Sequence, residues 1–75
     1  MKRSFTIQHK VLGQIIRKCR HRLGLTQEEA AERVGITVNF LGMVERGERN
    51  ITIKNLIKIS RGLNCPLAKL FKGIR

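Results

Sequence analysis

The chain has 75 residues, and 16 lysines and arginines against five acidic residues give it a formal net charge of +11. This length allows one small domain with a thin core and leaves no room for a second domain, which favours a helical bundle with short loops. The charge favours a polyanionic partner that is bound more weakly as salt rises, although a merely soluble basic protein would have a similar composition. All five acids are glutamates between residues 28 and 48, so purely basic segments flank the centre of the chain.

The start of the chain is predicted to be a flexible basic arm, residues 1–6, followed by a single domain at residues 7–75. Lys2 and Arg3 give the arm its charge, and it either reaches a minor groove or remains disordered. It lacks the apolar run of a signal peptide, and no stretch of the sequence is apolar enough for a membrane span.

A first helix is predicted from about Gln8 to Leu23, and Gly24 is expected to end it. Basic and amide side chains fill its outer faces. The stripe that repeats at helical spacing, and that we expect to face the core, is Leu12, Ile15, Ile16, Cys19 and Leu23.

Two short helices separated by a tight turn are predicted in the centre of the chain. Thr26 and Glu29 match a capping box that begins the first of them, and Gly35 permits a left-handed exit. Thr37 can cap the next helix, which Gly47 is expected to end. Such a pair must cross steeply, as in a helix-turn-helix, where the first helix braces the second so that its outer face and amino end can enter a DNA major groove.

Two further helices complete an all-α, five-helix prediction without strands. Thr52 can cap the fourth helix and Asn64 can close it in the left-handed conformation. Its expected inner stripe is Ile53, Leu56, Ile57, Ser60 and Leu63. Pro66 suits the first turn of a short fifth helix. The apolar face of the fifth helix is expected to form a homodimer interface, or one with another protein, through Leu67, Leu70, Phe71 and Ile74.

The sequence contains no constellation typical of an enzyme or a metal site. It has no aspartate, no serine–histidine–acid set and no phosphate-binding glycine loop. The candidate ligands His9, Cys19, His21 and Cys65 lack paired close spacing. We therefore expect no catalysis, cofactor or metal, and we interpret both cysteines as small buried apolar residues. Because a disulfide-stapled domain of this size usually has more cysteines, a reducing cytoplasm is the expected location.

The sequence resembles the Cro and phage-repressor type helix-turn-helix family, also called XRE-like, from about Val11 to Phe71. The segments that carry the resemblance are Leu25–Ala31, Val34–Thr37 and Glu45–Gly47. The segment Gly42–Lys54 is similar, more particularly, to the controller proteins of bacterial restriction-modification operons. The resemblance implies a lambda-repressor-like domain of five helices with the helix-turn-helix at the second and third. Members of the family mostly act as dimeric transcriptional regulators on palindromic operators.

The resemblance also places positions that face base edges at the start of the third helix, at Val38, Asn39, Gly42 and Met43. The amide of Asn39 can donate and accept in one plane and so pair with adenine N6 and N7, unless it only bonds to nearby backbone. Val38 offers apolar contact alone, for instance with a thymine methyl group. Gly42 stands where serine is usual, which suggests that the helix backbone closely approaches DNA or another helix.

Other roles follow from the same resemblance. Gln27 is implied to contact phosphate, the alternative being a plain exposed residue, and Thr37 can touch phosphate as well as cap. Phe40 faces either the core or the groove. Glu45 is implied to form a structural ion pair with Arg20 rather than to catalyse. The residues expected to pass the sugar-phosphate backbone are Arg46, Arg49 and Asn50.

These observations predict a sequence-specific DNA-binding transcriptional regulator that acts as a dimer in the cytoplasm. One alternative is an antitoxin-type or other helix-turn-helix protein whose fifth helix binds a protein partner. Another is binding of membrane or RNA by the basic amphipathic helices. A dimer should place its two reading helices roughly 34 Å apart, one turn of DNA.

Overall fold

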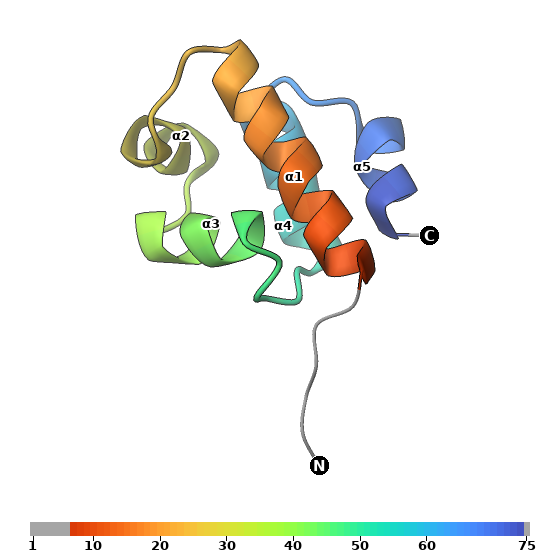
Figure 1. The fold of residues 1–75 in the computed structure, drawn as a ribbon. Helices are drawn as coiled ribbons and strands as arrows, with labels where there is room; N and C mark the ends of the chain where they lie inside the picture. Colours follow the sequence, from red (N-terminus) through yellow and green to blue (C-terminus); the bar gives the residue numbers. More distant parts are fainter. Residues whose placement is uncertain (1–6, 75) are drawn as a thin grey trace.

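The computed structural model describes residues 7–74 and contains five helices with no strand among those residues. The helices are α1 (Ile7–Arg22), α2 (Gln27–Val34), α3 (Val38–Glu45), α4 (Ile53–Gly62) and α5 (Leu67–Ile74) (Figure 1). The predicted all-α, five-helix fold is confirmed. The expected basic arm, residues 1–6, and Arg75 lie outside the described residues, as do the side chains of Ile7 and Ile74.

Threonine side chains begin the three middle helices. The Oγ1 atom of Thr26 accepts from the backbone N–H of Glu29 at 3.1 Å, and the Glu29 carboxylate accepts in return from the Thr26 N–H at 2.8 Å. Thr37 caps α3 and Thr52 caps α4 through bonds of 3.0 and 3.1 Å to the third residue of each helix. Each cap satisfies a backbone donor that the helix leaves unpaired, which is worth about 1 kcal/mol.

The turn between α2 and α3 is set by Gly35, whose φ of 89° lies in the left-handed region. Its N–H and that of Ile36 both donate to the carbonyl of Ala31, at 2.8 and 3.0 Å. Only Gly35 and Ile36 separate the end of α2 from the cap of α3. The chain therefore changes direction within two residues, and this short turn fixes the angle at which the two helices cross.

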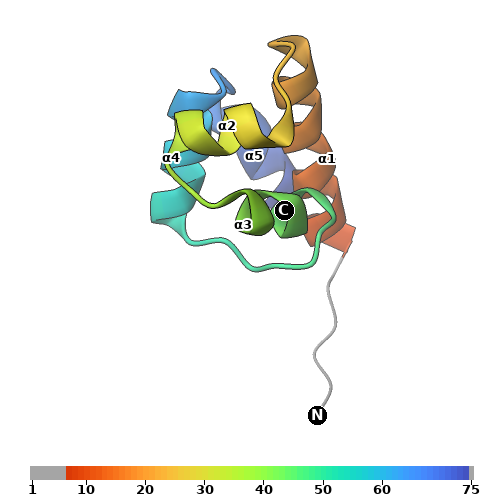
Figure 2. The same cartoon turned by 90° about the vertical axis from the view of Figure 1, so that its left-hand side faces the viewer.

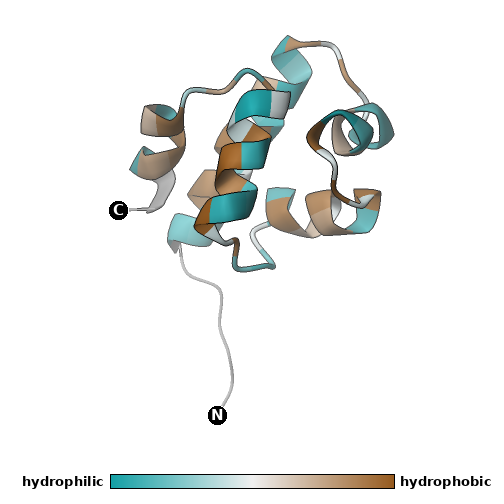
Figure 3. Ribbon diagram, turned by 180° about the vertical axis from the view of Figure 1, so that it is seen from behind, coloured by the Kyte–Doolittle hydropathy of each residue, from teal (hydrophilic) through white to brown (hydrophobic). Residues whose placement is uncertain are grey.

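The core is assembled around α1, which runs between α2 and α3 on one side and α5 on the other (Figures 1 and 2). Hydrophobic and hydrophilic residues alternate along the helices (Figure 3), and the buried hydrophobic ones form a single core cluster. No helix within residues 7–74 has the length and apolar character needed to cross a bilayer. The largest fully buried side chains come from α1, α3, α4, α5 and the segment between α4 and α5, and they are Ile16, Cys19, Leu41, Val44, Leu56, Ile59, Leu63, Cys65 and Leu70.

The stripe predicted for α4 is wrong at its first position. Ile53 is 61% exposed, whereas Ile59, which the prediction omitted, is completely buried beside Leu56 and Leu63. Ile53 lies in the exposed first turn of α4, beyond the edge of the core. The spacing of apolar residues was compatible with either stripe, and packing against the other helices selected the one through Ile59.

The prediction that Leu70 lies at a dimer interface is also wrong. Leu70 is completely buried within its own chain and belongs to the hydrophobic core, so it has no surface to offer to a dimer interface. Leu67 packs partly against the same core. Phe71 remains 42% exposed on the outer side of α5.

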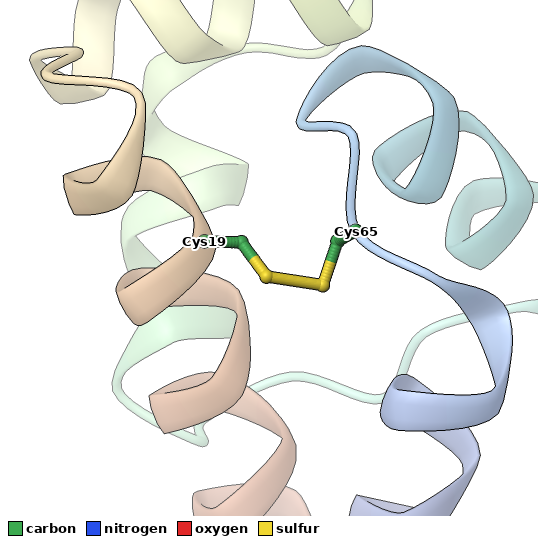
Figure 4. Close-up of a disulfide and its surroundings, with 2 residues drawn as sticks. All are labelled: Cys19 and Cys65. Atoms are coloured by element: carbon green, nitrogen blue, oxygen red, sulfur yellow. A yellow bond between two sulfur atoms is a disulfide. The ribbon is translucent and has the colours of Figure 1, made fainter.

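The two cysteines are joined in a disulfide, contrary to the prediction of free thiols (Figure 4). Their burial is confirmed, since each is 1% exposed. Cys19 comes from the last turn of α1 and Cys65 from the segment before α5, 46 residues later, with a Cα–Cα distance of 5.9 Å. Closing a loop of this length restricts the unfolded chain and is worth roughly 4 kcal/mol in a chain-entropy estimate. The expectation of a reducing location rested on the absence of a disulfide and loses that support.

Candidate nucleic-acid interface

Helix α3 lies at the edge of the bundle with its amino-terminal half facing outward (Figure 2). Leu41 and Val44 anchor its inner side and are buried. Thr37, Val38 and Asn39 at its start are exposed, with Val38 at 41%. The side chain of Asn39 is therefore open to a partner, as a role in reading bases requires.

A buried ion pair fixes α3 to α1. The guanidinium of Arg20 donates to both carboxylate oxygens of Glu45, through Nε at 2.6 Å and Nη2 at 2.9 Å. Its Nη1 donates to the carbonyl of Leu25 at 2.9 Å, just before α2. The two charged residues are only 6% and 5% exposed. The pair implied by the resemblance is present, and its bidentate geometry ties three segments together.

Gln27 takes part in this network rather than pointing only to solvent. Its Nε2 donates to Glu45 Oε1 at 3.0 Å, and the residue is partly buried. One hydrogen of the amide is thereby committed to the protein, which leaves the second hydrogen and the backbone N–H groups of the first turn of α2 for an anion. The alternative of a plain exposed residue is wrong, since Gln27 links the start of α2 to the end of α3.

Gly42 is buried beneath two side chains, that of Arg46 at the end of α3 and that of Gln27 from the neighbouring helix α2. A Cβ atom at this position would lie 3.3 Å from Nη1 of Arg46 and 3.7 Å from Oε1 of Gln27. Glycine therefore lets the guanidinium and the amide converge on the outward side of α3 next to Met43, which is partly buried. The close approach expected from the sequence is made by the chain's own polar groups.

The residues after α3 form a line of polar contacts. Arg46 caps the helix, and its Nε donates to Glu48 Oε1 at 3.1 Å. The guanidinium carbon of Arg49 lies 5.2 Å from the ring centroid of Phe40, within the range of a cation–π contact. Phe40 is half-buried and packs against the core, so it has one face inward and carries Arg49 on the other. Asn50 is hydrogen-bonded to His9 of α1.

Two glycines, Gly13, which sequence reasoning did not single out, and Gly47, which was expected to end α3, allow α1 to cross the end of α3. A Cβ atom on Gly13 would lie only 2.5 Å from the carbonyl oxygens of Val44 and Glu45. One on Gly47 would lie 2.8 Å from Cγ and 2.9 Å from Cα of Lys10, and its φ is 75°. The available signal for Gly13 was a glycine in the interior of an amphipathic helix, where it costs about 1 kcal/mol relative to alanine.

The described residues contain no group of three or more metal-ligating side chains. The arrangement they do present is an exposed helix start, held by a buried ion pair and by close packing at two glycines, with the exposed arginines Arg46 and Arg49 nearby. An outward-facing helix braced by its predecessor in this way is a recognition helix, and this arrangement defines the helix-turn-helix class of proteins.

Comparison with known proteins assigns the family. The chain belongs to the helix-turn-helix family, whose model matches residues 16–70. It is 38% identical to the control protein C.SmaI of Serratia marcescens over 81% of this chain and 73% of that protein. It is 35% identical to the control protein C.MunI of a Mycoplasma species over 83% of this chain and 85% of that protein. The similarity to restriction-modification controllers is thus confirmed.

The fold is also similar to that of a controller protein of known structure. The crystal structure of the restriction-modification controller protein C.AhdI from Aeromonas hydrophila superposes with a TM-score of 0.83 at 33% identity. The match covers 88% of this chain and all of that one. The five helices and their order are therefore those of a controller protein.

Proposed function

We propose that the protein is a sequence-specific DNA-binding transcriptional regulator that acts as a homodimer on a palindromic operator. The observation that carries the proposal is the outward, rigidly braced start of α3 with Asn39 exposed, in a chain with a net charge of +11. The family and the relatives named as control proteins support it. Its action is binding, without catalysis or a cofactor, and its place is the cytoplasm, where the DNA of a prokaryote lies.

Within this proposal each residue of the candidate interface has a chemical role. Asn39 pairs with an adenine edge, while Val38 and Met43 supply apolar contact to thymine methyl groups. Thr37 and the first turn of α2 at Gln27 bind phosphates. The groups that follow the sugar-phosphate backbone are Phe40 with its partner Arg49, Arg46 and Asn50. Because Gly42 has no side chain, nothing at that position of α3 prevents these groups from approaching the DNA.

Replacing Asn39 with alanine should weaken binding to the preferred operator by about 1–3 kcal/mol, because the amide loses both bonds to its base. Binding to random-sequence DNA should change much less, since backbone contacts remain. The operator is first obtained by selecting bound sites from a random DNA pool, and affinities are then measured at one fixed salt concentration. Equal losses on both DNAs would remove Asn39 from base reading, and failure to enrich any site would overturn the proposed function.

The dimer interface is proposed on the outer side of α5. Phe71 is an exposed aromatic residue there, and Leu67 is only partly covered by the core. Exposed aromatic groups are frequent anchors of protein interfaces. The side chain of Ile74, also expected at this interface, lies outside the described residues.

Replacing Phe71 with glutamate should raise the dimer dissociation constant by about tenfold or more, because a charge would be buried against an apolar partner surface. Analytical ultracentrifugation over a concentration series measures this change. Val38→Glu is a matched control, since Val38 is 41% and Phe71 42% exposed. The control should remain dimeric while losing DNA binding. Unchanged dimerisation in Phe71→Glu, or a monomeric parent protein, would contradict the proposed interface.

A further inference from the structure

A small groove is lined by residues of α1 and α5. Helix α5 lies on the side of α1 away from α3 (Figure 1). The volume of the groove is about 310 Å³. Three of its lining residues follow the helical spacing of α1 and flank Cys19, and two come from α5. The lining is Ile15, Lys18, Cys19, Arg22, Lys69 and Lys72.

The groove is strongly basic. Four of its six lining residues are cations, and all four side chains are exposed. No carboxylate in the described part of the chain lies within ion-pair distance of any of them. Charges gathered on two walls of a concave surface focus the field and raise the local concentration of anions. A small anion is therefore drawn toward the floor of the groove.

The floor contains one half of the disulfide. Cys19 lines the groove and Cys65 does not, because Cys65 approaches from the segment before α5 (Figure 4). Cys19 is 1% exposed, so a reagent that reaches it must be small and must enter through the groove. The groove is thus lined by one cysteine of the pair, behind a basic entrance.

We propose that this groove is a thiol–disulfide exchange site that takes small anionic thiols and forms a mixed disulfide on Cys19. The incoming thiolate attacks the sulfur of Cys19, which forms the new S–S bond, while the bond to Cys65 breaks. Cys65 leaves as a thiolate and takes a proton from water. No outside oxidant is consumed, since the incoming thiol is oxidised to the same extent as Cys65 is reduced.

The cations assist this reaction in two ways. They concentrate the anionic reagent, and they stabilise the thiolate form of a thiol that has entered, which is the nucleophilic form. The product also releases the covalent link between α1 and the segment before α5. The reaction does not involve the DNA-binding surface, so its test is independent of the proposed function.

The test compares two small thiols, mercaptosuccinate and neutral 2-mercaptoethanol, on the oxidised full-length protein. Each rate is divided by the rate of the same thiol with a small uncharged disulfide, which removes differences in intrinsic reactivity. We expect mercaptosuccinate to react about tenfold faster than 2-mercaptoethanol on this scale at low salt. The advantage should largely disappear at about 1 M salt, where the Debye length is roughly 3 Å.

Charge-neutralising variants locate the effect. Lys18→Gln with Lys69→Gln should remove most of the advantage and slow 2-mercaptoethanol much less than mercaptosuccinate, because the reactive thiolate of 2-mercaptoethanol carries only one negative charge. Lys54→Gln with Lys58→Gln removes the same charge from exposed positions outside the groove and should keep the advantage. Early quenching with an alkylating reagent, followed by peptide mapping, should find the mixed disulfide on Cys19 and the alkyl group on Cys65. Equal effects of the two double variants, adducts on Cys65, or two free thiols in protein prepared under air would each overturn the proposal.

Discussion

Replacing Glu45 with alanine should lower the free energy of unfolding by about 3–5 kcal/mol. The substitution leaves Arg20 buried, at 6% exposure, without the carboxylate that accepts two of its hydrogen bonds. Water reaches the guanidinium poorly, so the desolvation of the charge is no longer compensated. The amide of Gln27 loses its partner as well. Chemical denaturation of the protein with its disulfide intact measures the change.

Glu48→Ala provides the matched control. Its carboxylate also accepts from an arginine, Arg46, at 3.1 Å, but the two side chains are 49% and 56% exposed. An exposed ion pair contributes about 0–1 kcal/mol, because water screens it and replaces its hydrogen bonds. If both glutamate variants lost the same small amount, Glu45 would not be a buried partner of Arg20 and the bracing of α3 would need another source.

The local features of the fold could be predicted from the sequence because their causes lie within a few residues. Thr26 and Glu29 form the capping box that their spacing predicted, and Gly35 makes the left-handed turn into α3. Asn64 adopts a φ of 55°, as predicted for the end of α4. Caps and turns of this kind depend on backbone donors and conformations that a short segment determines by itself.

The features that the sequence did not predict join distant segments. The disulfide connects Cys19 with Cys65, and neither spacing nor number of cysteines shows that the α4–α5 connection lies against the last turn of α1. The burial of Leu70 depends in the same way on where α5 lies against the core. Apolar periodicity identifies the face of a helix but does not say which end of that face leaves the core, as Ile53 illustrates.

The candidate site, too, was predictable only in the features that depend on a short segment. Its outward residue Asn39 was identifiable because helical spacing puts Leu41 and Val44 on the opposite side. The hydrogen bond from Gln27 to Glu45 and the contact of Arg49 with Phe40 were not identifiable, because each bridges two elements whose relative position is set by packing. The exposed surface was thus predictable from one helix, while its bracing required the whole bundle.

Replacing Gly13 with alanine should also destabilise the protein, by about 1–3 kcal/mol. An added methyl group would meet the carbonyl oxygens of Val44 and Glu45 at 2.5 Å, and these are backbone atoms that cannot rotate away. Alanine is favoured over glycine within a helix by about 1 kcal/mol, so the net loss would report a steric cost larger than that gain. Denaturant unfolding measures it, with Gln14→Ala at the neighbouring exposed position of α1 as control.

The sign of the stability change in Gly13→Ala shows whether α1 and α3 are in close contact or lie farther apart. If the helices are as close as the structure shows, relief of the overlap must move the end of α3 away from α1, and the affinity for the operator falls together with the stability. Gln14→Ala should change neither quantity by more than about 0.5 kcal/mol. A Gly13→Ala protein as stable as its parent, or more stable, would mean that α1 and α3 lie farther apart, because only the gain in helix propensity would then remain.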